Sequence, residues 1–327
     1  MNTDVLHWLT DEPSDVSVRF QALRDLADAG PETLDPLRQR IAEEGWGVRF
    51  LAARGENGHW GRAFYSPKWT SSHYTLLELR NIGLPGDNPA ARQTIDLILR
   101  EFRLTPEPRD TPAAVSPRKS ITLGGPVTTD VCINGMFLNY ACYFGAPAAA
   151  LAPIVDFLLA ERMPDGGFNC QSNRPYARSV HSSLHTTISV LEGIHSYQDG
   201  GYTYRLQELL DAAGPAREFI LHHRLFKSDH TGEVINPSFQ MLASPWRWHY
   251  DILRALDHFQ ESGVPYDERM EDALEVIRNK RRADGTWPVQ NRYAGEVFFH
   301  MEKTGGPSRW NTLRALRVLR MYDRGHP

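Results

Sequence analysis

The 327-residue sequence is poor in cysteine, in long apolar runs and in excess charge. It has only three cysteines, an odd and sparse set that argues against a disulfide framework and favours a reducing, cytoplasmic compartment. No apolar run approaches the roughly 18 residues of a membrane-spanning helix, and no start of the secretory-signal type is visible. A formal net charge of −4 offers no basic surface to nucleic acid. We therefore expect a cytoplasmic protein with neither a transmembrane segment nor a nucleic-acid partner.

What the sequence does contain is one turn that occurs three times. In each copy an apolar helical stretch runs into a glycine next to an aromatic residue, and a second helix follows. The copies are Asn57–Trp60, Asp165–Phe168 and Asp284–Trp287. Such a repeat predicts helix pairs that bury their apolar faces against neighbouring pairs. The turn aromatics are expected to be packing residues, because large rings mainly supply buried area.

The second helices begin alike. A ring-bearing residue stands first, a Thr or Asp follows two places on, and apolar residues recur at helical spacing. These openings start at His73, His185, His249 and Trp310, and a looser fifth has Cys132 in the place of the ring. The pattern predicts an all-α fold in a single domain spanning residues 1–327, with a long proline-containing loop or lid at about 105–129.

The glycine–aromatic turns between paired helices resemble the repeat of the terpenoid cyclase and protein prenyltransferase superfamily, over roughly residues 47–322. The resemblance implies an α/α toroid of about five to six helix pairs around a central cavity. It also implies a transferase or cyclase-like enzyme that acts on an apolar, isoprenoid-like small molecule. The acidic Asp-x-Asp-Asp motif with which squalene cyclases protonate their substrate is not present, so chemistry of that type is not expected.

Asp130 and Cys132, followed by His185, resemble the Asp-x-Cys and later His that hold zinc in protein prenyltransferase β subunits. A carboxylate, a thiolate and an imidazole suit a catalytic zinc, which has three protein ligands and an open position. The resemblance thus implies zinc as the cofactor. Two simpler interpretations stay open: Cys132 is a small buried apolar residue, and Asp130 is a helix cap.

Further candidates surround the expected openings of the inner helices. His249, with Tyr250 and Asp251 beside it, is expected to serve in catalysis, and His249 could also be a fourth metal ligand. Aromatic faces stabilise cations, and basic groups at a cavity mouth attract anions. On these grounds the expected substrate-binding residues are His73, Trp69, Arg178, Arg247, Trp248 and Trp310.

Two other functions fit the same repeat. One is a toroid without catalytic activity that binds a small molecule or a peptide, so a protein partner remains open. The other is a glycan-processing toroid enzyme, which would use His, Tyr and Arg and would not need Asp130 or Cys132. Metal content separates the zinc enzyme from the glycan-processing enzyme, because fold alone does not specify function.

Overall fold

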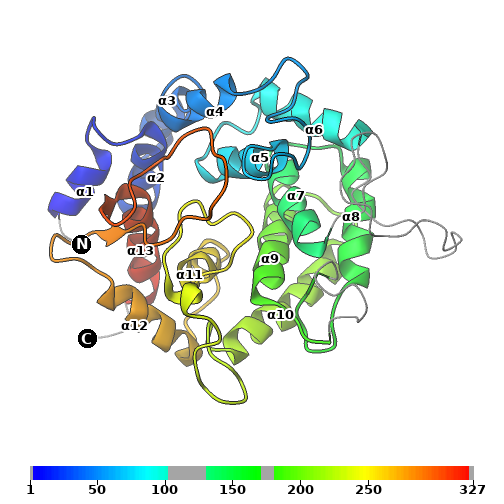
Figure 1. The fold of residues 1–327 in the computed structure, drawn as a ribbon, viewed down its shortest axis with the longest axis vertical. Helices are drawn as coiled ribbons and strands as arrows, with labels where there is room; N and C mark the ends of the chain where they lie inside the picture. Colours follow the sequence, from blue (N-terminus) through cyan, green and yellow to red (C-terminus); the bar gives the residue numbers. More distant parts are fainter. Residues whose placement is uncertain (1–2, 102–129, 171–179, 324–327) are drawn as a thin grey trace, which may run out of the picture. The chain divides into compact units, whose positions relative to one another are not determined.

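The computed structural model describes residues 3–101, 130–170 and 180–323. Within these ranges the chain is mostly helical, and its strands are one antiparallel pair of two residues each (Figure 1). The prediction of an all-α fold is confirmed. No helix in the described ranges is both long and apolar enough to cross a membrane. The predicted loop at 105–129 lies outside the described residues.

The elements follow one another along the chain without a long strand. The first α-helices are α1 Thr3–Thr10, α2 Val16–Leu26, α3 Pro31–Arg40, α4 Gly45–Ala52, α5 Ser72–Asn81, α6 Pro89–Glu101 and α7 Val131–Tyr143. The later ones are α8 Ala148–Ala160, α9 Leu184–Asp199, α10 Leu206–His222, α11 Ile252–Glu261, α12 Glu271–Asn279 and α13 Arg309–Tyr322. The remaining elements are the 3₁₀-helices η1 Pro237–Gln240 and η2 Glu268–Met270 and the strands β1 Trp287–Pro288 and β2 Pro307–Ser308.

The three predicted turns share one backbone geometry. Their glycines have φ angles of +81° at Gly58, +94° at Gly166 and +83° at Gly285, a region that other residues adopt only with strain. The aromatic side chain that follows is almost completely buried in each copy. Its backbone N–H then donates to a hydroxyl of the second helix. These bonds join Trp60 to Ser72 (3.0 Å), Phe168 to Thr187 (3.0 Å) and Trp287 to Thr312 (2.9 Å).

The contacts divide the chain into two compact units. Unit 1 comprises Met1–Ala53, Asn81–Pro85 and Leu221–Pro327. Unit 2 comprises Arg54–Arg80 and Gly86–Ile220. The expectation of a single domain is not tested by this division and stays a prediction.

In unit 1, α13 packs against both α2 and α11 (Figure 1). Side-chain caps begin these three helices, and the capping residues are Asp15, Asp251 and Ser308. A cap satisfies backbone amides that would otherwise lack partners at a helix start. The caps therefore also fix the loops that precede α2 and α13.

In unit 2, α7 and α9 lie side by side (Figure 1). A Cβ placed on Gly135 would lie 2.7 Å from the carbonyl oxygen of Ser189, and one on Gly193 would lie 2.5 Å from the carbonyl oxygen of Gly135. Side chains at these positions would not fit, so the two glycines let the helices approach backbone to backbone.

Candidate active site

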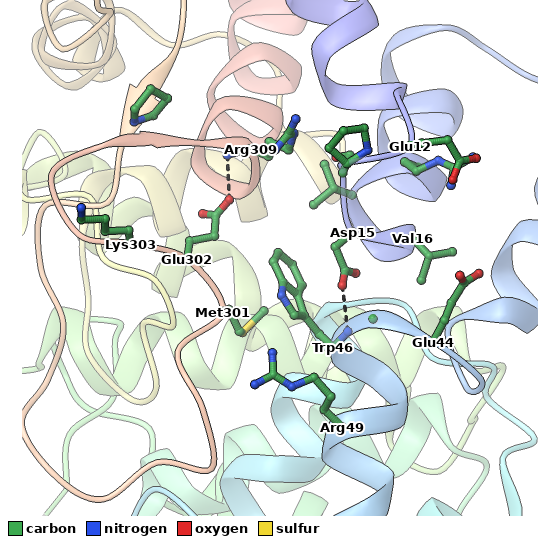
Figure 2. Close-up of a pocket in the computed structure, with 16 residues that line it drawn as sticks. Glu12, Asp15, Val16, Glu44, Trp46, Arg49, Met301, Glu302, Lys303 and Arg309 are labelled. Carbon is green, nitrogen blue, oxygen red and sulfur yellow. Dashed lines mark hydrogen bonds and ion pairs between the residues drawn. The ribbon is translucent and has the colours of Figure 1, made fainter.

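Unit 1 contains a cavity of about 540 Å³ at the start of α2, the start of α4 and the loop before α13. Figure 2 shows carboxylates, cations and an indole ring directed into it. The lining residues that matter most for chemistry are Asp15, Trp46, Arg49, Glu302, Lys303 and Arg309. A concave site with a few converging polar groups is the usual form of a small-molecule site.

Asp15 lies at the junction of α2 and α4. One carboxylate oxygen accepts the backbone N–H of Ser17 at 2.9 Å, and the other accepts that of Trp46 at 2.8 Å. Burial raises the pKa of Asp15, and these amide donors oppose the rise only in part. Gly45 makes this arrangement possible, because its φ is +62° and a Cβ there would lie 2.3 Å from the Asp15 carboxylate.

Glu302 lies at the N-terminus of α13 (Figure 2). Its Oε1 accepts the backbone N–H groups of Arg309 at 2.7 Å and Trp310 at 3.2 Å, and its Oε2 accepts the Ser308 hydroxyl. Burial raises the pKa of Glu302 as well, since desolvation outweighs the three donors. The cavity thus holds two carboxyl groups that retain a proton at higher pH than an ordinary acid.

Aromatic and basic side chains complete the lining. The ring of Trp46 meets that of Trp310 edge to face, with centroids 5.9 Å apart. The guanidinium of Arg49 lies 3.7 Å from the centroid of the Phe299 ring, and that of Arg309 lies 4.6 Å from the Trp8 ring. This combination of acids, an indole and cations suits a polar, hydroxyl-rich ligand better than a long apolar chain.

The sequence predictions did not include Asp15 or Glu302. A signal existed for Asp15, because Ser14-Asp15 stands directly before an amphipathic helix and is typical of a cap. Nothing in the local sequence distinguishes Glu302 from Glu296, the other acid of its loop. The two residues come from opposite ends of the chain, so only packing brings them to one cavity.

The predicted catalytic residues His249, Tyr250 and Asp251 lie in unit 1. Tyr250 and Asp251 have hydrogen-bond partners that stabilise the structure. The Tyr250 hydroxyl donates to the carbonyl of Leu225 at 2.6 Å, and Asp251 caps α11 through Arg254 N–H at 2.8 Å. The catalytic role of the three residues stays a prediction, and the geometry provides a structural role for Tyr250 and Asp251.

His249 lies in a stack of three rings. Its ring centroid is 3.8 Å from that of Trp248 and 3.4 Å from that of Tyr293. Trp248, one of the expected substrate-binding residues, is half-buried in this stack. The rings of Trp248 and Tyr293 stack on the imidazole and therefore limit the access of a ligand to its faces.

The expected metal ligands lie in unit 2, and the close partner of Cys132 is a second thiol. The Cys132 backbone N–H donates to Cys170 Sγ at 3.2 Å, and the hydrogen bond from Cys170, followed by burial, raises the pKa of the Cys132 thiol. Asp130 occupies the N-cap position of α7 without a side-chain cap bond, and His185 lies in the first turn of α9. The proximity of Cys170 was not predicted.

Within the described ranges no group of three or more His, Cys, Asp and Glu side chains is arranged to hold a metal ion. The prediction of a zinc and metal-binding protein is therefore not supported in these ranges, because a zinc site requires at least three converging ligands. The prediction that zinc is the cofactor is not tested by the structure, and metal analysis of the purified protein would test it.

The remaining predicted substrate contacts are mostly buried. His73 is fully buried, and its Nδ1 pairs with the Tyr140 hydroxyl at 3.0 Å. Trp69 packs edge to face on Tyr74, at a centroid distance of 4.8 Å. Arg178 lies outside the described residues.

The two predicted substrate contacts that remain belong to unit 1. Arg247 is buried with a φ of +58°, a strained value for an arginine. Trp310 contacts two residues that line the cavity, Trp46 and Glu302. Its role as a substrate contact stays a prediction.

No family model and no curated protein matches the sequence. Among solved structures, a glycosyl hydrolase of family 88 from Bacteroides vulgatus is similar, with a TM-score of 0.51 and 10% sequence identity. The match covers 96% of this chain and 95% of that chain. At this identity the likeness concerns the fold, and it confirms the α/α toroid class.

This likeness corrects the family assignment made from the sequence. The similar structure is a glycosyl hydrolase, so the resemblance to terpenoid cyclases and protein prenyltransferases is not supported. The predicted zinc-dependent enzyme for an isoprenoid-like substrate is wrong on the same finding. The physical reason is that glycine–aromatic turns between helix pairs serve the packing of a toroid, whatever chemistry the toroid performs.

Proposed function

We propose that the chain is a glycan-processing enzyme that hydrolyses glycosidic bonds in the unit 1 cavity. The observation that carries the proposal is the pair Asp15 and Glu302, two carboxyl groups with raised pKa values in one cavity. The likeness to a glycosyl hydrolase supports it at the level of fold. The proposal corresponds to the glycan-processing alternative that the sequence left open. It assigns the catalytic roles to Asp15 and Glu302, whereas the alternative named His, Tyr and Arg.

The chemistry needs one acid and one base. A protonated carboxyl gives its proton to the glycosidic oxygen as the bond from that oxygen to the sugar carbon breaks. The second carboxyl, as carboxylate, takes a proton from the water that attacks the same carbon, so that each product ends with a hydroxyl. Burial raises the pKa of both carboxyl groups, which favours the protonated form that the acid needs. The Trp46 indole supplies an apolar face for a sugar ring.

The direct test is turnover of a panel of aryl glycosides and oligosaccharides by the wild type and by Glu302→Gln. The glutamine retains an oxygen for the amides of Arg309 and Trp310, and the Ser308 hydroxyl can donate or accept, so the loop should keep its shape. We expect kcat/KM to fall by about 10²–10⁴-fold, the usual contribution of a general acid or base. Asp15→Asn should have a similar effect.

The matched control is Glu12→Gln, which removes an acid at the cavity rim whose side chain is 83% exposed. Its activity should stay within about twofold of the wild type, because an exposed carboxylate has an ordinary environment. The kcat/KM of the wild type should depend on pH in a bell-shaped manner. Glu302→Gln and Asp15→Asn should each lose either the acidic or the alkaline limb of this curve. Equal activity of Glu302→Gln and Glu12→Gln on every cleaved glycoside would refute the proposal.

A further inference from the structure

Unit 2 brings two cysteines into contact at the start of α7. Cys132 is the second residue of this helix, and Cys170 follows the turn Asp165–Phe168 by two residues. The backbone N–H of Cys132 donates to Cys170 Sγ at 3.2 Å, and the Thr186 hydroxyl donates to the same sulfur at 3.4 Å. The two cysteines are 38 positions apart in the sequence, so tertiary packing places them together.

The two thiols also interact with each other. The hydrogen bond with Cys170 is the largest of the effects that raise the pKa of the Cys132 thiol, and burial is the next. Cys132 therefore keeps its proton and donates it toward the Cys170 sulfur. Because Cys170 Sγ touches the backbone nitrogen of Cys132, it lies near the path of the Cys132 sulfur around its own Cα–Cβ bond. Rotation about that bond brings the sulfurs toward the separation of about 2.05 Å that a disulfide needs.

The surroundings of this pair differ from those of the third cysteine. Cys132 is half-buried, which gives a small solute access to the pair, whereas Cys142 is 4% exposed. Burial lowers the pKa of Lys68 and the charge of Cys132 opposes this shift, so a cation lies near the pair. Reactive cysteines typically lie beside cations and at helix N-termini, and buried cysteines in apolar surroundings are inert.

We propose that Cys132 and Cys170 are a redox pair, which hydrogen peroxide converts to a disulfide and which a dithiol reduces again. An oxygen of the peroxide bonds to Cys170 Sγ as the O–O bond breaks, which gives a sulfenic acid and one water. Cys132 Sγ then attacks Cys170 Sγ. The S–S bond forms, the S–O bond breaks, and the hydroxide that leaves takes the Cys132 proton to become a second water.

The two sulfurs together lose two electrons in this sequence, and the peroxide gains them. Cys170 reacts first because Cys132 is the thiol that keeps its proton, and the thiolate is the nucleophile. The modification is independent of the proposed glycoside hydrolysis.

Peroxide treatment of the folded wild type is the direct test. Thiols titrated after unfolding should fall from three per chain to one, and dithiothreitol should restore them. Chymotrypsin cuts after Phe137 and Tyr140, which separates Cys132 from Cys142. Mass spectrometry of the digest should therefore show the Cys132 peptide linked to the Cys170 peptide. Three remaining thiols, or a link through Cys142, would overturn the proposal.

Two serine variants test the order of the steps. Cys132→Ser keeps the sulfur that reacts first and removes the one that resolves it, so Cys170 should accumulate a sulfenic acid that dimedone labels. Cys170→Ser should form no link, and its Cys132 should take up at least about tenfold less dimedone. Equal labelling of the two variants would contradict the assignment of Cys170 as the first sulfur.

The matched control is Cys142→Ser, which removes the third cysteine and leaves the pair intact. It should form the link at the rate of the wild type and fall from two thiols to none. In denaturant the wild type should also form links through Cys142, because the pairing of Cys132 with Cys170 depends on the fold. If a variant does not fold, the digest of the wild type decides the question.

Discussion

The two units differ in the polar groups that they bury. In unit 1, the carboxylate of Asp257 accepts Arg314 Nε at 2.9 Å and Arg317 Nη2 at 2.7 Å, so full charges lie inside and are paired. In unit 2, the buried polar groups include the neutral pair His73 and Tyr140 and two acids, Glu78 and Glu192. The paired charges of unit 1 depend on electrostatic compensation, whereas the close contact of α7 with α9 in unit 2 depends on shape. The two units should therefore respond to different substitutions.

The largest effect is expected from Asp257→Asn in unit 1. The asparagine keeps the shape but leaves Arg314 without a negative partner in a buried place, and Arg317 retains only Asp25. We expect the free energy of unfolding to fall by about 3–5 kcal/mol, the usual result of breaking one side of a buried ion pair. Denaturant unfolding monitored by circular dichroism measures it. A loss below 1 kcal/mol would mean that charge pairing does not dominate unit 1.

The corresponding test in unit 2 is Gly135→Ala. The added Cβ would lie 2.7 Å from the Ser189 carbonyl oxygen, and backbone cannot give way as a side chain can. We expect a loss of about 2–3 kcal/mol from overpacking, despite the better helix propensity of alanine.

Gly214→Ala in α10 is the matched control for this substitution. A Cβ there meets nothing within 4 Å, so the substitution should stabilise by about 0.5–1 kcal/mol. Similar effects of the two glycine substitutions would contradict close packing of α7 on α9.

A third test uses acid. Burial lowers the pKa of His73 to about 3, below the value of about 6.5 in an unfolded chain. The unfolded state therefore binds the proton first, and stability is lost as pH falls from about 6.5 toward 3. The loss due to His73 should reach about 2 kcal/mol by pH 5.

Unfolding curves at pH 7 and pH 5 measure this difference. In His73→Phe the stability lost between pH 7 and pH 5 should be smaller by about 2 kcal/mol than in the wild type. This holds whatever stability the substitution itself removes at pH 7. The exposed residue His300 provides the control, because His300→Gln removes a histidine without changing the buried interior. If the acid loss of His73→Phe equals that of the wild type, His73 is not held neutral in the folded state.

The smallest effect is expected at a surface ion pair of unit 2. Arg205 Nη1 lies 2.7 Å from Asp156, and the two side chains are 35% and 46% exposed. Asp156→Asn should change the free energy of unfolding by less than about 1 kcal/mol, because solvent screens exposed charges. A cost near that of Asp257→Asn would erase the distinction between buried and exposed pairs.

The helix pairs and their turns were predictable because their signals are local. Gly58, Gly166 and Gly285 all stand in the left-handed region, next to the buried aromatic that the repeat predicted. The site was not predictable in the same way. Cys132 was matched to His185 by its position in the repeat, but the folded chain places Cys170 beside it. Repeat alignment gives the order of elements, and it does not give the rotation or approach of each side chain.

The sequence alone determined the all-α class, the repeated turn and several helix starts, since helical periodicity, glycine φ angles and caps act over a few residues. Tertiary structure decided which groups meet. It brought Asp15 and Glu302 into one cavity from opposite ends of the chain, and it raised their pKa values by burial. Desolvation and long-range contacts depend on the packing of every element around a group, so the chemistry of the site emerged only from the folded chain.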